Sequence, residues 1–239
     1  MKRRLKINGF IIFVVVVLIV VFPSVFFRHE YPHSWDEFSE VSGIALILLG
    51  QILRASSRGY KAEHSANGRS LIQDGPYALV RNPMYLGILL IGLGIVLILF
   101  NWWVVAIFLC VFIVRYLLLI FKEEKKLVVM FPEGYQDYCK RVPRILPSMA
   151  TLLQKDISEY LPLKLPWLKK EIGSILVVLL MTLFIESWED IKNGGLVAYF
   201  KESITFLVII ILFICMVIYL SRRTAKLEKD ASSKSKNTL

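Results

Sequence analysis

The apolar positions of the 239-residue chain gather into six runs that polar segments separate. A helix that crosses a bilayer needs roughly 17 to 25 predominantly apolar residues. The runs cover Asn8–Phe27, Ser39–Ala55, Met84–Phe100, Trp102–Phe121, Ile172–Trp188 and Ile204–Leu220. This pattern predicts an all-α fold, a polytopic membrane helical bundle of about six transmembrane helices.

The third and fourth runs are separated by the single residue Asn101, which predicts a tight antiparallel helical hairpin over residues 84–121. The first run follows Met1, Lys2, Arg3 and Arg4 and so resembles the start of a signal peptide. It is long, however, and no small-residue cleavage site follows it, so we interpret it as a retained helix.

Positive charge alternates with the runs, and this alternation predicts the orientation in the membrane. The segment between the first two runs carries Glu30, Asp36 and Glu37 against Arg28 and is expected to be external. Basic residues in the other segments predict that both termini are cytoplasmic. They include Lys2, Arg3, Arg4, Lys6, Arg54, Arg58, Lys61, Arg69, Arg81, Lys122, Lys125, Lys126, Lys140, Arg141, Arg144, Arg222, Arg223, Lys226 and Lys229.

The composition narrows the class of protein further. Hydrophobic residues make up 56% of the chain, which is too apolar for a soluble domain of this size. The net charge of +10 is then mainly a topology signal, with attraction to anionic lipid headgroups, and not a sign of nucleic-acid binding. Cys110, Cys139 and Cys215 stand singly, without the spacing of a metal site.

Chemically active side chains concentrate first in residues 75–87, GPYALVRNPMYLG, directly before the third run. Pro76 and Pro83 restrict the backbone and shape the start of the third helix, with Pro83 near its first turn. A helix amino terminus presents unpaired N–H groups, which suit the carboxylate of a ligand. Simple anchoring of the helix at the membrane interface is the alternative interpretation.

A second concentration begins after the fourth run with Glu123 and Glu124 and continues to Pro147. Adjacent carboxylates at a helix carboxyl end oppose the helix dipole unless a ligand or lysines compensate them. A solvated charge run with the neighbouring lysines is therefore the alternative here. Tyr138 lies three residues from both Tyr135 and Arg141, which predicts one helix face and a lid over residues 131–144.

Together the two segments resemble the isoprenylcysteine carboxyl methyltransferases and the related phospholipid N-methyltransferases. The resemblance covers residues 50–147 and consists of G-P-Y-x-x-x-R-x-P-M-Y-x-G, a helical hairpin, E-E-x-x-L and F-x-x-x-Y-x-x-Y-x-x-x-V-x-R-x-x-P. The chain departs from the family at Asn82, where many members have histidine, and at Leu119, where the isoprenylcysteine enzymes have arginine. Gly92 and Gly94 are similar to the phospholipid enzymes, although small residues in a membrane hairpin also permit close packing.

The resemblance implies that both segments fold over one S-adenosylmethionine at the cytosolic mouth of the hairpin, without a Rossmann domain. One side of the cofactor would be lined by Tyr77, Arg81, Asn82, Pro83, Tyr85 and Gly87. The other side would be lined by Glu123, Glu124, Tyr138, Arg141 and Arg144. A glutamate suits this place because the ribose hydroxyls and the methionine amino group are both donors.

The candidate catalytic residues are Arg115 and Glu123. Arg115 lies about 12 Å deeper along the helix than Glu123, and a cation inside a membrane helix is usually functional. We expect Arg115 to face the hairpin interior and orient an anionic acceptor, with structural pairing to a carboxylate such as Glu186 as the alternative. A carboxylate acceptor needs only such a cation, whereas an amine must first lose a proton.

The sequence thus favours carboxyl O-methylation of an isoprenylcysteine-like or other lipophilic acceptor at the cytoplasmic face. Phospholipid N-methylation is the alternative, and a non-enzymatic membrane scaffold or channel is the alternative of another class. The expected partners are this acceptor and membrane lipids, with no metal or nucleic acid, and the expected location is a prokaryotic plasma membrane.

Five regions are predicted from these features. Residues 1–56 form two transmembrane helices, and residues 57–147 form the methyltransferase core with a cofactor-covering segment at 122–147. Residues 148–171 are an amphipathic interfacial segment, residues 172–220 are a second membrane hairpin, and residues 221–239 are a disordered basic tail.

Overall fold

The computed structural model describes residues 33–65, 70–148, 157–171 and 195–236, together with residues 13, 17, 18, 21–27, 173 and 175. The helices are α2 (Pro23–Phe26), α3 (His33–His64), α4 (Pro76–Leu79), α5 (Pro83–Leu99), α6 (Trp102–Met130), α7 (Pro132–Arg141), α9 (Ile157–Tyr160) and α11 (Gly195–Lys236). The predicted all-α membrane fold is confirmed.

Three described helices are long and apolar enough to cross a membrane, in the stretches Phe38–His64, Trp102–Met130 and Leu207–Asp230. They contain the predicted second, fourth and sixth runs. The third run forms α5, an apolar helix of 17 residues. The first predicted run, Asn8–Phe27, is described only in part, and the fifth, Ile172–Trp188, falls largely outside the described residues.

The tight hairpin between α5 and α6 forms as predicted, with Asn101 at its turn. The Asn101 backbone N–H donates to the Phe26 carbonyl at 3.1 Å, and its side-chain amide donates to the carbonyls of Phe27 at 2.9 Å and Val25 at 3.2 Å. Because the backbone N–H and the side-chain amide of this one residue satisfy three backbone carbonyls, the turn needs no additional loop residues.

Glycines bring α3 and α5 into backbone contact. A Cβ atom at Gly50 would lie 2.6 Å from the carbonyl oxygen of Gly87, and one at Gly94 would meet the carbonyl oxygen of Gly43. Gly92 faces the other neighbour, since its Cβ would lie 2.5 Å from the Phe108 ring of α6. The predicted packing role of Gly92 and Gly94 is therefore confirmed, because only residues without a Cβ allow this approach.

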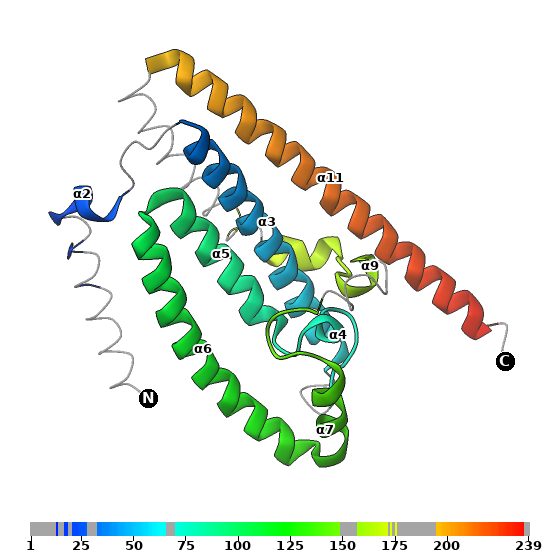
Figure 1. Cartoon of the computed structure of the whole chain (residues 1–239). Helices are drawn as coiled ribbons and strands as arrows, with labels where there is room; N and C mark the ends of the chain where they lie inside the picture. The colour runs from blue at the N-terminus through cyan, green and yellow to red at the C-terminus, as the bar shows by residue number, and fades with distance from the viewer. Residues whose placement is uncertain are drawn as a thin grey trace.

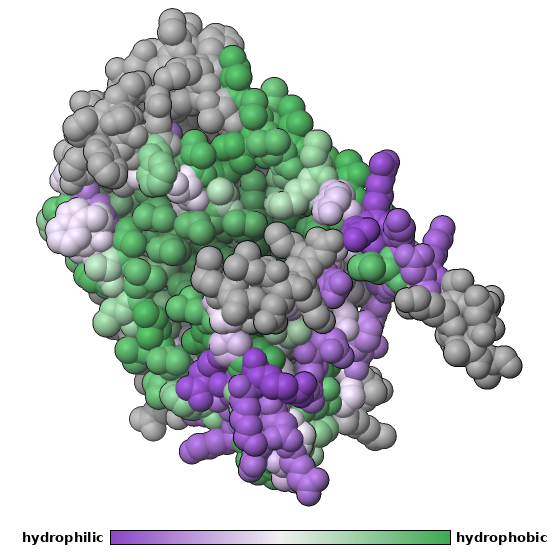
Figure 2. Space-filling view, turned by 45° about the vertical axis from the view of Figure 1, so that its right-hand side comes forward, coloured by the Kyte–Doolittle hydropathy of each residue, from purple (hydrophilic) through white to green (hydrophobic). Residues whose placement is uncertain are grey.

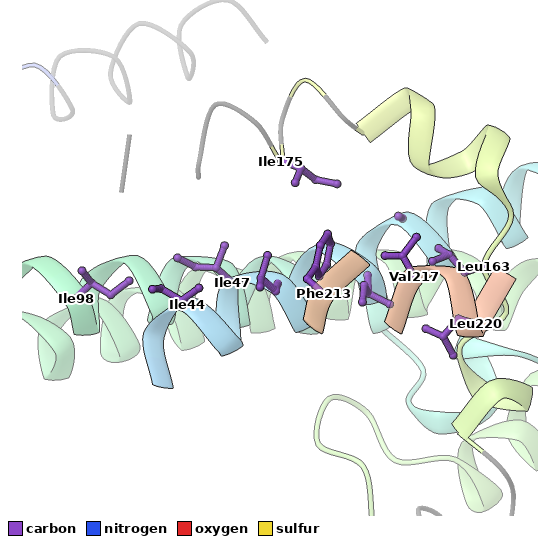
Figure 3. Close-up of a cluster of buried hydrophobic side chains, with 11 residues drawn as sticks. Ile44, Ile47, Ile98, Leu163, Ile175, Phe213, Val217 and Leu220 are labelled. Carbon is purple, nitrogen blue, oxygen red and sulfur yellow. The ribbon is translucent and has the colours of Figure 1, made fainter. Parts of the chain in front are cut away.

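Helix α3 lies between α5 and α11, and α6 flanks α5 on the other side (Figure 1). A buried apolar cluster joins α3, the end of α5 and α11 to the segment around Leu163 (Figure 3). Its labelled members are Ile44, Ile47, Ile98, Leu163, Ile175, Phe213, Val217 and Leu220. This packing attaches the last helix to the front half of the chain.

The segments expected on the cytoplasmic side lie together at one end of the molecule. The ends of α3, α6 and α11, the start of α5, and the short helices α4, α7 and α9 share that end (Figure 1). Hydrophilic side chains gather toward the bottom and right of the space-filling view, and apolar side chains cover much of the rest (Figure 2). The orientation in a bilayer itself stays a prediction.

Two expectations from the sequence are wrong. Helix α6 continues beyond Phe121 to Met130, so Glu123 and Glu124 lie inside a helix and not at its carboxyl end. The predicted disordered tail is helical up to Lys236, as part of α11. Both extensions lack glycine and proline and are rich in lysine, glutamate or alanine, which favour helix.

Candidate active site

Glu124 is the centre of the site, because three segments meet at its carboxylate. It is 8% exposed on α6. Arg81 Nη1 lies 3.2 Å from Glu124 Oε1, and Arg144 Nη2 lies 3.0 Å from Oε2 while its Nε donates to Oε1 at 3.2 Å. The guanidinium of Arg144 also lies 4.7 Å from the centre of the Phe121 ring. This pairing holds the segments before α5 and after α7 against α6.

Arg81 and Asn82 make further bonds across the same junction. The Arg81 backbone N–H donates to the Pro143 carbonyl at 2.8 Å, and its Nη1 contacts Cys139 Sγ at 2.7 Å. Asn82 Nδ2 donates to the Arg144 carbonyl at 3.1 Å. Arg81 Nε is buried without a hydrogen-bond partner among the described residues. Asn82, the position that departs from the family pattern, thus has a structural role here.

Glu123 differs from its neighbour because its side chain is exposed. The Tyr85 hydroxyl donates to Glu123 Oε1 at 2.7 Å, which joins the start of α5 to α6. The Tyr85 ring meets Tyr116 edge-on with centroids 5.2 Å apart, and Tyr116 stacks on Phe112 at 3.9 Å. The exposed carboxylate therefore lies at the end of an aromatic row on α6.

Two tyrosines complete the site from α4 and α7. The Tyr138 hydroxyl donates to the Tyr77 carbonyl at 2.7 Å. Burial raises the pKa of Tyr138, and burial together with the charge of Glu123 raises the pKa of Tyr77. Both phenols therefore stay protonated near neutral pH and can donate hydrogen bonds, but they cannot act as bases.

Helix α7 covers this part of the molecule, in the segment predicted to be a lid. Tyr135 and Tyr138 are buried on the same face, as their spacing predicts, and pack near Leu71 and Leu127. Arg141 lies at the exposed rim, where its Nη2 donates to Gln73 Oε1 at 2.7 Å. Whether the segment opens and closes stays a prediction.

Pro83 and Gly87 lie on the α3 side of the site. Pro83 is buried in the first turn of α5, as predicted. A Cβ atom at Gly87 would lie 2.9 Å from the Gly50 carbonyl oxygen and 3.2 Å from Arg54 Cβ. The structure thus gives Gly87 a packing role, and its role toward a cofactor stays a prediction.

Arg115 does not face the hairpin interior, so that expectation is wrong. Its side chain is exposed, and it has no ion pair within the described part of the chain. The aromatic side chains of Phe112 and Tyr116 occupy the face of α6 toward Tyr85 instead. Glu186, the proposed structural partner, lies outside the described residues.

Sequence reasoning missed the aromatic row and the contacts of Cys139 and Gln73. The row had a signal, because Phe108, Phe112 and Tyr116 recur at the i, i+4 spacing of one helix face. Cys139 and Gln73 had none, since a lone thiol or amide becomes informative only when folding brings Arg81 or Arg141 beside it.

The fold and the site together describe a helical membrane protein in which two motif segments close over one hairpin. Residues 38–134 match the phospholipid methyltransferase family. The chain is also 32% identical over 116 residues to the protein-S-isoprenylcysteine O-methyltransferase of Schizosaccharomyces pombe. This alignment covers 45% of this chain and 49% of that relative. These matches agree with the resemblance found in the sequence, over the matched segment.

The matches leave the rest of the chain without a counterpart. The chain spans about half the length of this curated relative, and residues 157–236 lie beyond the family match. No solved structure matches the chain.

Proposed function

We propose that this protein is an integral membrane methyltransferase that uses S-adenosylmethionine to methylate a carboxylate on a lipophilic, isoprenylcysteine-like acceptor at the cytoplasmic face. The observation that carries the proposal is the Tyr85–Glu123 hydrogen bond of 2.7 Å. It joins the two motif segments at an exposed carboxylate, while the adjacent Glu124 fixes their positions through Arg81 and Arg144.

The hydrogen-bonding groups around the site fit this cofactor. Glu123 would accept hydrogen bonds from ribose hydroxyls or the methionine amino group. The buried Arg81 Nε, which lacks a partner among the described residues, suits an acceptor such as the methionine carboxylate, and the Tyr77 hydroxyl is held protonated. When bound, the cofactor supplies an activated methyl group on a cationic sulfur.

The chain's own contribution would be orientation and exclusion of water. A carboxylate acceptor is ionised at neutral pH and needs no base, so positioning can supply most of the acceleration. The buried Tyr135 and Tyr138 of α7 keep water from the Glu124 junction. The faces of Tyr116 and Phe112 attract cationic groups and provide an apolar surface for the acceptor chain.

Arg115 remains the proposed cation for the acceptor, although from the exposed side of α6. A cation on a membrane helix attracts a carboxylate that approaches through the lipid. Replacing Arg115 by Met should weaken acceptor binding and leave the binding of S-adenosylhomocysteine unchanged. Unchanged acceptor affinity and turnover would remove Arg115 from the mechanism.

Phospholipid N-methylation is the second candidate, because the matching family is that of the phospholipid methyltransferases. An amine acceptor must lose a proton, and the exposed Glu123 would be the group to accept it. Transfer of labelled methyl to a prenylated cysteine analogue or to phosphatidylethanolamine separates the two reactions. An alkali-labile label on the analogue identifies an ester and supports carboxyl methylation.

Calorimetry with S-adenosylhomocysteine on the detergent-solubilised protein tests the enzyme class itself. We expect saturable binding that Glu123→Gln weakens by about tenfold or more, equivalent to roughly 1.4 kcal/mol. Glu133→Gln is the matched control, because Glu133 is an exposed glutamate in the first turn of α7. Absence of binding to the wild-type protein would instead favour a non-enzymatic scaffold.

A further inference from the structure

A cavity of about 340 Å³ lies at the junction of α3, α4, α9 and α11. Tyr60 and His64 line it from the end of α3, Gly75 and Ala78 from the start of the motif segment, and Glu228 from α11. Most of its other lining residues come from positions 158–167, beyond the family match at 38–134. The cavity is thus built largely from residues beyond the family match.

Ser158 is the first sign that this cavity receives a ligand. It lines the cavity and is only 1% exposed, yet its hydroxyl has no hydrogen-bond partner among the residues that the structure describes. A buried hydroxyl without a partner lowers the stability of the fold, because it has lost its hydrogen bonds to water and gained none in exchange. The buried Ser57, by contrast, donates to the Leu53 carbonyl. A ligand with a polar atom would satisfy the Ser158 hydroxyl.

The charges and rings of the cavity indicate the chemistry of that ligand. The carboxylates of Asp74, Glu159 and Glu228 line the cavity together with Lys164, which is paired with Glu228. Aromatic rings add to this wall, because Tyr60 and His64 stack with centroids 3.9 Å apart and Trp167 lies nearby. Carboxylates combined with aromatic faces recognise organic ammonium groups.

The protein already holds an ammonium group in this way at the same place. Lys164 Nζ lies 2.7 Å from Glu228 Oε1 and 2.6 Å from Glu63 Oε2. It also lies 5.2 Å from the centre of the Trp167 ring. Asp74 is exposed on the α4 side of the cavity, where a second ammonium group would meet a carboxylate and the Tyr60 ring.

The position of the cavity separates it from the proposed methyl-transfer site. Gly75 and Ala78 line the cavity, whereas Tyr77 between them contacts Tyr138 of α7. Its lining residues His64 and Glu228 stand at the ends of the candidate membrane stretches Phe38–His64 and Leu207–Asp230. A group at the level of lipid headgroups can reach it.

We propose that this cavity binds an organic ammonium group, held by its carboxylates and aromatic rings with Ser158 bonded to a neighbouring polar atom. The group belongs either to a zwitterionic lipid headgroup or to a soluble amine.

Titration of the full chain with choline, in nanodiscs of phosphatidylglycerol alone, tests the proposal. We expect saturable stabilisation against heat by choline and none by its neutral isostere 3,3-dimethyl-1-butanol. Ser158→Ala and Asp74→Asn should each weaken choline binding by about fivefold, the effect of one lost hydrogen bond or one partly exposed charge. Ser57→Ala and Asp137→Asn are the matched controls and should leave binding unchanged.

A second titration, in phosphatidylcholine nanodiscs, identifies the source of the ammonium group. Loss of the response to free choline assigns the cavity to the lipid headgroup, and persistence assigns it to a soluble amine. The proposal is overturned if choline fails to bind in phosphatidylglycerol, if the neutral isostere binds equally, or if S-adenosylhomocysteine displaces choline. A Ser158→Ala protein that binds choline as tightly as the wild type also contradicts it.

Discussion

Two buried glutamates, Glu171 and Glu124, each lie between two arginines. Glu171 is paired with Arg54 at 3.4 Å and Arg58 at 2.6 Å. Both of its arginines come from α3 and lie four residues apart, so Glu171 attaches one segment to one helix. Glu124 instead joins Arg81 and Arg144 from two separate segments.

The difference between the two clusters lies in what stands beside each glutamate. Glu124 has the exposed Glu123 as its neighbour, within reach of Tyr85, whereas Glu171 follows the exposed Lys169 and Lys170. The two clusters use the same ion-pair chemistry for different purposes. The Glu124 cluster holds the neighbouring exposed Glu123 in place, whereas the Glu171 cluster attaches a segment to α3. A buried carboxylate between arginines is by itself no sign of a site.

Removing each charge in turn should separate the two roles most strongly. Glu124→Gln should lower the free energy of unfolding by about 3 kcal/mol, because it leaves the mostly buried Arg81 without its counter-charge. It should also abolish S-adenosylhomocysteine binding. Glu171→Gln should cost only about 1 kcal/mol, since the Arg58 side chain is 60% exposed. Denaturation in detergent measures the stability of both variants, and calorimetry measures their binding of S-adenosylhomocysteine. Equal loss of binding in the two variants would contradict the separate roles of the two glutamates.

Gly87 tests whether the two clusters are mechanically connected, because it touches Arg54 of the Glu171 cluster and belongs to the motif segment. Gly87→Ala should destabilise the protein by about 2 kcal/mol, since its Cβ would meet backbone. Gly134→Ala in α7 is the control, because its nearest contact would be an ordinary 3.8 Å. It should stabilise by up to about 1 kcal/mol. Unchanged stability of Gly87→Ala would disprove a rigid contact.

Tyr85→Phe sharpens the assignment of Glu123. Removing one hydroxyl should weaken S-adenosylhomocysteine binding about fivefold, because Glu123 loses the hydrogen bond that orients it. Unfolding should change by less than about 1 kcal/mol, because Glu123 stays hydrated. Tyr219→Phe on the exposed face of α11 is the matched control. Wild-type affinity in Tyr85→Phe would show that Glu123 needs no such orientation.

The smallest effect is expected from the ionisation of Tyr138, on the Glu124 side. The pKa of Tyr138 is raised above its ordinary value of 10.0, so the unfolded state ionises first as pH rises. The contribution of Tyr138 to stability is therefore fully present well below pH 10 and is lost as the pH rises. At pH 10 the loss is about 0.4 kcal/mol. Tyrosinate absorbance combined with unfolding in the wild type and in Tyr138→Phe checks this. An identical decline in both proteins would contradict it.

The sequence predicts much of what depends on local pattern. Apolar runs predicted the membrane helices, the single Asn101 predicted the hairpin, and the spacing of Tyr135 and Tyr138 predicted their shared buried face. The resemblance implied that Tyr85 and Arg81 lie across one cofactor from Glu123 and Glu124. The direct contacts between these side chains were not predicted.

What the sequence did not predict depends on rotation and distant partners. The exposure of Arg115 follows from which face of α6 the aromatic row takes, and hydrophobicity is nearly equal on all faces of such a helix. The pairing of Glu171 with Arg54 joins positions far apart in the chain, where charge pattern indicates only topology. The apolar run ends at Phe121, where the helix is expected to leave the membrane, but α6 continues to Met130. The end of an apolar run therefore does not predict the end of the helix.

The unequal lengths of α5 and α6 have a consequence for the surrounding lipid. With 17 residues, α5 spans about 26 Å, less than the roughly 30 Å hydrocarbon thickness of a typical bilayer. Hydrophobic mismatch of this size is relieved when the bilayer thins locally. The start of α5, where Tyr85 meets Glu123, would then sit in a dimple of the membrane surface. An acceptor with a lipid tail would reach the methyl donor there without lifting that tail out of the acyl chains.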